Sequence, residues 1–198
     1  MKRFAALLSS FLVLPFAEAT ETGPIGFDSA VEQLRSAVGA WEVKTTQYGD
    51  DGNVARVACG TYRFEWIVPD RVLAGRSDIP DWKQASGLLF YVNERRSTIE
   101  MASVGADGNL WVMTGPAGGE TRTTPAVPTS DGETMQLRFT RFNVSPNRFE
   151  SRMEVSTDGG SSWKQGNHQV FERARTGDGG HASGLRFRKP TRNYVPLT

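Results

Sequence analysis

His168 and Cys59 are the side chains whose types most readily suggest chemistry. The chain has two histidines and one cysteine, so a three-histidine metal site and an intrachain disulfide are both impossible. No P-loop, Gly-x-Ser-x-Gly or His-Glu-x-x-His pattern is present, and no Asp-Gly site has the spacing of a calcium loop. The 22 acidic residues leave open a carboxylate pair that acts as general acid and base. The sequence therefore predicts no particular catalytic residue.

His168 leaves one metal-based alternative open. Some small ten-stranded barrels bind haem through a histidine near the C-terminus, and His168 lies in the last predicted strand. Strand alternation opposes this role, because inward-facing Phe171 and Arg173 turn His168 outward unless a bulge intervenes. Cys59 is predicted to face outward by the same alternation from Tyr62. We expect no cofactor, with a haem ligated by His168 as the alternative.

A further motif runs from Ser156 to Trp163 and resembles the Asp-box of sialidase propellers. In that hairpin brace the carboxylate, here Asp158, accepts hydrogen bonds from turn N–H groups, and the tryptophan packs beneath. Propellers repeat the motif in each blade, whereas this chain has one copy. The motif therefore predicts structural roles for Asp158, Gly160 and Trp163, and excludes a sialidase.

Short strands separated by Asp-Gly turns are predicted over most of the chain. Asp-Gly pairs favour the positive φ of tight hairpins, and they stand at 51–52, 107–108, 131–132 and 158–159. The segments between them are rich in Val, Thr and aromatic residues, which predicts strands at 41–48, 54–68, 71–79, 85–93, 97–104, 109–115, 134–142, 148–156 and 163–173. Nine or ten antiparallel strands indicate an all-β sandwich or a closed barrel.

A short helix is predicted before the first strand. Its apolar stripe, at helical spacing, consists of Phe27, Val31, Leu34 and Val38. Ser29 and Glu32 fit a capping box at the start of the helix, and Gly39 fits the residue that ends it.

One face of the predicted strands is apolar and the other is charged, which indicates an interior and a solvated exterior. The side chains expected to line the interior are Val43, Tyr62, Phe64, Trp66, Leu73, Met101, Leu137, Phe139, Phe149 and Met153. Val68, Met135 and Val155 share the same phase, and Tyr62 and Ser151 are possible polar anchors. This lining suits a lipid tail or a flat aromatic molecule and disfavours a strongly charged ligand, whose desolvation would go uncompensated. The same side chains could equally fill the interior.

The two ends of the chain and one internal segment differ from the rest. Residues 1–19 have a basic start, an apolar run at 4–16 and the cleavage signal Ala17-Glu18-Ala19, which together predict a secretory signal peptide. We expect one domain at 20–175, a flexible tail at 176–198 and a periplasmic or secreted location. Residues 116–132 are rich in Pro and Gly, and are predicted to form an irregular loop.

The charge balance excludes one large class of partner. The chain has 23 basic and 22 acidic residues, a formal net charge of +1, so it lacks the positive excess that captures nucleic acid. After cleavage we expect a neutral protein without stable membrane insertion.

Gly39-Ala40-Trp41, after a helix and at the start of the first strand, resembles the Gly-x-Trp signature of lipocalin-like (calycin-like) barrels. The resemblance implies that Arg173, at the end of the last strand, lies across Trp41 and closes the base of the barrel. Over residues 31–175 the chain also resembles a bacterial family of secreted lipocalin-like proteins of unknown function. The shared segments are Val38-Gly39-Ala40-Trp41, Gly60-Thr61, 156–163 and Phe171-Glu172-Arg173. The resemblance implies a closed antiparallel up-and-down barrel of about nine to ten strands and brings no catalytic residues.

Together these features predict an exported lipocalin-like protein that binds a small hydrophobic or amphipathic ligand in its barrel. The alternatives are an enzyme with polar residues at the barrel mouth, the haem barrel, and a solid barrel whose function lies on its surface.

Overall fold

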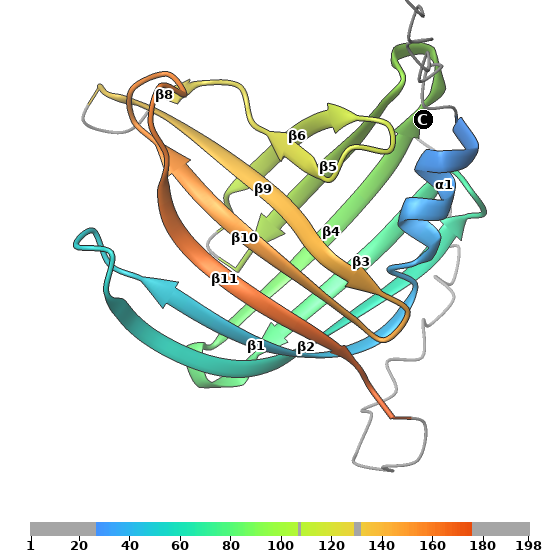
Figure 1. Ribbon diagram of the computed structural model, residues 1–198, viewed down its shortest axis with the longest axis horizontal. Helices are drawn as coiled ribbons and strands as arrows, with labels where there is room; N and C mark the ends of the chain where they lie inside the picture. The colour runs from blue at the N-terminus through green and yellow to red at the C-terminus, as the bar shows by residue number, and fades with distance from the viewer. Residues whose placement is uncertain (1–26, 107, 129–131, 176–198) are drawn as a thin grey trace, which may run out of the picture.

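An antiparallel sheet that closes on itself dominates the computed structural model, which describes residues 27–106, 108–128 and 132–175 (Figure 1). Its elements are α1 (Phe27–Arg35), β1 (Gly39–Tyr48), β2 (Val54–Val68), β3 (Val72–Ile79), β4 (Gln84–Asn93), β5 (Thr98–Gly105), β6 (Leu110–Pro116), β7 (Thr121–Thr123), β8 (Val127–Pro128), β9 (Thr134–Ser145), β10 (Arg148–Ser156) and β11 (Lys164–Arg173). The predicted signal peptide and tail lie outside the described residues.

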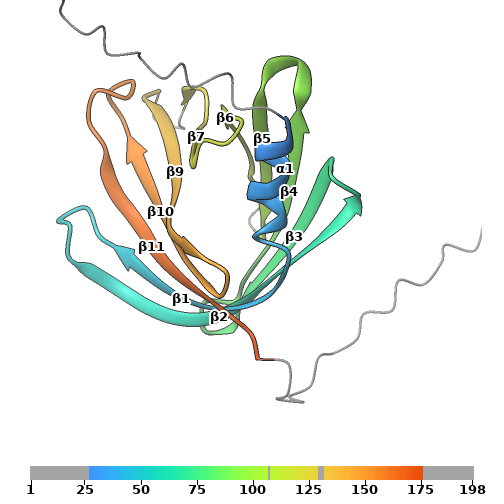
Figure 2. The same cartoon turned by 45° about the vertical axis from the view of Figure 1, so that its right-hand side comes forward.

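Ten of these strands form the barrel. The hydrogen-bonded order is β10-β11-β1-β2-β3-β4-β5-β6-β7-β9, and the pairing of β9 with β10 closes the ring, while β8 pairs with β9 alone. Figure 2 looks into the barrel, with β9, β10 and β11 on one side and β3 and β4 on the other. The predicted all-β closed barrel with a short N-terminal helix is confirmed.

The nine predicted strands are present, but the expected loop at 116–132 is wrong in part. It contains β7 and β8, and β7 is needed for closure because it bridges β6 and β9. A three-residue strand is too short for alternation to reveal it in the sequence. Gly115 permits the close approach of β7, since a Cβ atom at Gly115 would lie 2.1 Å from the Thr121 carbonyl oxygen.

The helix begins and ends earlier than the sequence predicts. It already includes Phe27, so Ser29 lies within its first turn rather than at a capping position, and Glu32 forms an ion pair with Arg35. Gly39 does not end the helix but begins β1, with a φ of +124°. Side chains of β1 and β11 satisfy the carbonyl groups that follow the helix.

Trp41 and Arg173 provide those side chains and close the base of the barrel. Trp41 Nε1 donates to the Ala37 carbonyl oxygen at 2.8 Å, and Arg173 donates to the carbonyl oxygens of Val38 at 2.9 Å and Ser36 at 3.3 Å. The two residues are register partners, and the Arg173 guanidinium lies 4.3 Å from the centroid of the Trp41 ring. The contact implied by the lipocalin resemblance is therefore present.

The core fills the end of the barrel near α1. Trp41 packs edge-on against Phe149, with 4.7 Å between the ring centroids, and Phe149 stacks on Phe171, with 4.2 Å between theirs.

Val68, predicted to face inward, is 47% exposed, because the strand register shifts between Trp66 and Val68.

The Asp158 motif forms the β10–β11 hairpin as a hydrogen-bonded brace. The Asp158 carboxylate accepts from the Ser162 N–H at 2.9 Å, the Ser162 hydroxyl at 2.6 Å and the Ser156 hydroxyl at 2.8 Å. Trp163 Nε1 donates to the Gly160 carbonyl oxygen at 3.0 Å. The bonds from Ser162, followed by that from Ser156, lower the pKa of Asp158 to about 2.

This lowered pKa predicts how the brace responds to acid. The ordinary Asp pKa is about 3.9, so the brace contributes its full stability above about pH 4 and loses it as pH falls through about 2. Asp158→Asn removes this contribution, and we expect its melting temperature to lie below that of the wild type at pH 6. Thermal unfolding monitored by circular dichroism should show that the difference in melting temperature between the two proteins becomes smaller from pH 4 to pH 2. A difference that does not change with pH contradicts the proposed role of the carboxylate.

Candidate functional site

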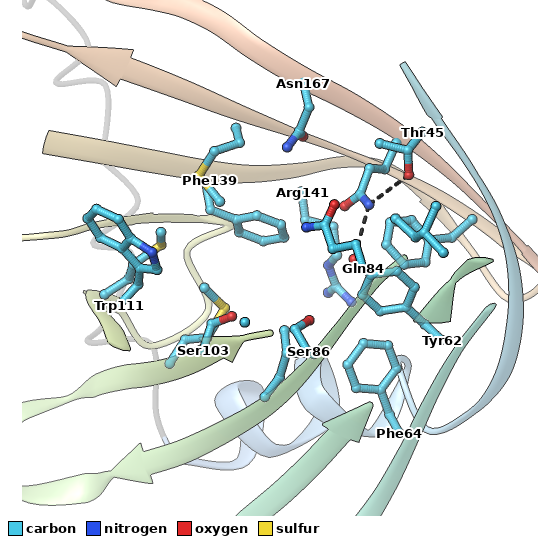
Figure 3. A pocket seen from close by; sticks show the side chains of 18 of the residues that line it. Thr45, Tyr62, Phe64, Gln84, Ser86, Ser103, Trp111, Phe139, Arg141 and Asn167 are labelled. Atoms are coloured by element: carbon cyan, nitrogen blue, oxygen red, sulfur yellow. Dashed lines mark hydrogen bonds between the residues drawn. The ribbon is translucent and has the colours of Figure 1, made fainter. Parts of the chain in front are cut away.

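The barrel is hollow, with a cavity of about 560 Å³ between α1 and the opposite mouth. Side chains from the helix and from strands on all sides of the barrel line it, and Figure 3 shows several of them. Its lining differs along the barrel axis. The middle is apolar, one wall carries linked polar groups, and cationic side chains stand at both ends.

Eight of the predicted interior side chains line this cavity, namely Tyr62, Phe64, Leu73, Met101, Leu137, Phe139, Phe149 and Met153. Three others do not. Val43 is buried in the core, and Trp66 packs against the core at its edge. Ser151 is fully buried behind the cavity wall, where its hydroxyl donates to Gln169 Oε1 at 3.4 Å. Ser151, expected as a polar anchor, therefore does not reach the cavity and bonds instead to Gln169, which lines it.

Phe90 and Met113, which were not predicted from the sequence, extend the apolar middle of the cavity. With Met101 and Met153, Met113 makes three thioether side chains in the lining. Methionine is unbranched and flexible, so such a wall adapts to ligands of different shape.

Gln169 organises the polar wall. Its Nε2 donates to the Thr45 hydroxyl at 3.0 Å and to the Tyr62 hydroxyl at 3.1 Å (Figure 3). Burial raises the pKa of Tyr62, so the phenol stays protonated and remains a hydrogen-bond donor at neutral pH. This wall can orient one polar group of an otherwise apolar ligand.

Arg141 links the segment that follows α1 to the wall of the barrel. Its Nε and Nη2 donate to the two carboxylate oxygens of Glu120 at 2.8 and 2.9 Å, and its Nη1 donates to the Ser36 hydroxyl at 3.0 Å. Burial acts to raise the pKa of Glu120, but the bonds and charge of Arg141 outweigh it and hold that pKa below its ordinary value. A hydrogen bond from Gln33 and the charge of Arg122 also lower it, so Glu120 is ionised and interacts with both arginines.

Arg122, on β7, is a second arginine at this end of the cavity. Its side chain is 3% exposed, its Nε is buried without a hydrogen-bond partner, and it forms no ion pair among the described residues. Burial and then the charge of Arg141 lower the pKa of Arg122 to about 10, against the opposing charge of Glu120, so the guanidinium remains charged at neutral pH. Arg122 was not predicted as a site residue because it lies in the segment 116–132, which was expected to be an irregular loop.

The mouth is polar and exposed. The Arg56 guanidinium lies 4.2 Å from the centroid of the Trp82 ring, and Lys83, the residue after Trp82, also lines the rim. Trp111 lies on the opposite wall near Ser103 (Figure 3). Trp82 and Trp111 are thus intrinsic fluorescent reporters of the cavity.

His168 and Cys59 are not part of the cavity. His168 Nε2 lies 2.7 Å from a carboxylate oxygen of Glu150, and its ring stacks on Phe142, whereas the neighbouring Asn167 and Gln169 line the cavity. This outward placement does not suit a haem ligand inside the barrel. Cys59 is exposed. Within the described residues no cluster of three or more His, Cys, Asp or Glu side chains is placed to hold a metal ion. In the same part of the chain no helix is long and apolar enough to cross a bilayer.

Comparisons with known proteins support the fold alone. No family model matches the chain, and no curated protein matches it. Among solved structures, it resembles Rv2717c from M. tuberculosis at 12% identity, with a TM-score of 0.53 over 74% of this chain and 98% of that one. Weaker likenesses include the S-type phycobiliprotein lyase CPES from Guillardia theta, with 11% identity and a TM-score of 0.45 over 73% of this chain and 92% of that one. Another is the redesigned barrel mFAP1 bound to DFHBI, with 16% identity and a TM-score of 0.37 over 71% of this chain and 97% of that one.

Proposed function

We propose that this protein is an exported, lipocalin-like carrier that holds a small hydrophobic or amphipathic molecule inside its barrel. The observation that carries the proposal is the cavity of about 560 Å³, within the size range of small-molecule sites. A solid barrel would leave no such space. The protein holds the ligand by removing it from water. Each CH₂ group that moves from water into the cavity contributes about 0.8 kcal/mol to the free energy of binding.

The lining supports this class of ligand. Aromatic and thioether side chains surround the middle of the cavity, and the Gln169–Tyr62 wall offers a hydrogen bond to a polar group. Side chains at the mouth are polar and exposed, so the ligand can enter from water at that end.

Export is the second part of the proposal. The basic start, the apolar run at 4–16 and Ala17-Glu18-Ala19 support a cleaved signal peptide and a periplasmic or secreted location. The motifs at Gly39-Ala40-Trp41 and 156–163 support membership in the bacterial family of secreted lipocalin-like proteins. N-terminal sequencing of exported protein should begin at Thr20, and a sequence that begins at Met1 contradicts export by cleavage.

Binding is tested by titrating the purified protein with 1-decanol, decanoate and uncharged polycyclic dyes while recording tryptophan fluorescence. We expect saturable binding with a Kd in the micromolar range, and a change in the emission of Trp82 and Trp111. Isothermal titration calorimetry should give one site per chain. If no member of the panel binds with saturation, the carrier proposal is wrong.

A further inference from the structure

We propose that the ligand is an amphipathic anion, whose carboxylate or similar group pairs with Arg122 at the α1 end of the cavity while its apolar tail points to the mouth. This inference rests on the carrier function proposed above and refines it by naming the charge and orientation of the ligand. It differs from the sequence-based expectation that the interior disfavours a strongly charged ligand.

Positive charge exceeds negative charge at the α1 end of the cavity. Two guanidinium groups, Arg122 and Arg141, meet one carboxylate, Glu120. Arg141 uses both oxygens of that carboxylate in a two-pronged ion pair, which is the strongest arrangement for these groups. Arg122, which is buried and makes no salt bridge among the described residues, shares the charge of Glu120 with Arg141, so this end of the cavity has one positive charge more than Glu120 balances. Buried charges in proteins are paired almost without exception, because an unpaired one is costly.

An unpartnered donor of Arg122 faces the same end of the cavity. Three buried side-chain polar atoms in the described part of the chain lack a hydrogen-bond partner, namely Gln33 Oε1, Thr98 Oγ1 and Arg122 Nε. Gln33 and Arg122 both line the cavity. The unsatisfied donor, Arg122 Nε, marks a place that a bound acceptor completes, whereas Gln33 Oε1 is itself an acceptor and takes no hydrogen bond from a carboxylate. A water molecule can accept a hydrogen bond there, but it does not neutralise the charge of Arg122.

The cavity next to Arg122 suits an apolar tail. Beyond Arg122 the lining becomes apolar, with Phe90 close enough that the Arg122 guanidinium lies 5.9 Å from its ring centroid. A headgroup at Arg122 therefore places a tail among aromatic and thioether side chains. The mouth offers a competing pair of cations, Arg56 and Lys83, but both are exposed, and water screens exposed charges strongly.

The test compares decanoate with 1-decanol, which share a ten-carbon chain and differ in charge, at pH 8 by calorimetry. The wild-type protein should bind decanoate about 10- to 100-fold more tightly than decanol, the usual effect of a hydrogen bond to a charged group inside a protein. Arg122→Met should remove this preference while leaving the affinity for decanol unchanged or improved. Arg122→Lys should retain part of the preference, because it keeps the charge but loses the planar fork. Arg56→Met, at the mouth, is the matched control and should keep the preference.

A second readout does not depend on the ligand. Removing the excess buried charge should stabilise the empty barrel, so Arg122→Met should raise the midpoint of urea unfolding. With saturating decanoate the wild type should instead unfold at a higher urea concentration than Arg122→Met.

The outcomes separate the two proposals. If decanol and decanoate bind equally well to the wild type, or if Arg56→Met removes the preference and Arg122→Met does not, the anion site at Arg122 is wrong and the carrier function stands. If neither compound nor any other member of the panel binds, both proposals are wrong.

Discussion

Trp41→Ala should lower the free energy of unfolding by about 3–5 kcal/mol, the range for truncating a buried tryptophan. Trp41 is 1% exposed, packs against Phe149, caps the Ala37 carbonyl oxygen and supports the Arg173 guanidinium. The substitution therefore removes packing and leaves the polar groups at the barrel base poorly oriented. Typical domains are stable by 5–15 kcal/mol, so the variant should be close to unfolding at 37 °C.

Urea unfolding followed by circular dichroism measures this loss, and Trp82→Ala is the matched control. Trp82 lies at the mouth, where its ring packs beneath Arg56, so its truncation should cost about 1 kcal/mol or less. If the two variants unfold at similar urea concentrations, Trp41 does not close the barrel as described.

Ser103→Trp should weaken the binding of decanol and decanoate about 10- to 100-fold while the barrel stays folded. Ser103 is a small side chain of β5 that lines the cavity, and an indole in its place occupies space that the ligand needs (Figure 3). Placing large groups where there is too little room costs about 1–3 kcal/mol. A loss of binding free energy of this size corresponds to the expected change in affinity.

Val104→Trp is the control for this experiment. Val104 is the next residue of the same strand, is 44% exposed and does not line the cavity. Calorimetry should give wild-type affinity for Val104→Trp. Equal affinities for all three proteins would place the ligand somewhere other than the cavity.

The architecture was accessible from the sequence because its signals are local. Alternation of apolar and charged residues at 62–68 and 148–156 predicts strands, and Asp-Gly pairs predict their turns. Gly39, Trp41 and Arg173 lie far apart in the chain, and only the resemblance to lipocalin-like proteins connected them. Their geometry explains the pattern, since a Cβ atom on Gly39 would lie 2.7 Å from Arg173 Nη1.

The candidate site was predicted less completely, and the errors have a physical cause. Alternation identifies apolar interior positions such as Phe64 and Phe139, but it gives no reason to place an arginine inside a barrel. Arg122 lies on a three-residue strand within a Pro- and Gly-rich segment, where no periodic pattern can be read. Its inward position depends on long-range pairing of β7 with β6 and β9. Likewise, the polar wall around Gln169 depends on Thr45 and Tyr62, which belong to other strands.

The carrier proposal predicts that the ligand contacts side chains inside the barrel, and methionine methyl groups test this most directly. Met101, Met113 and Met153 line the cavity, whereas Met135, on β9, does not. In protein labelled with ¹³C at the methionine methyl groups, saturating decanoate should shift the signals of those three residues and produce NOEs between them and the decanoate chain. The Met135 signal should stay in place. Binding that leaves the three cavity signals unmoved, or that moves Met135 alone, would contradict a ligand site inside this barrel.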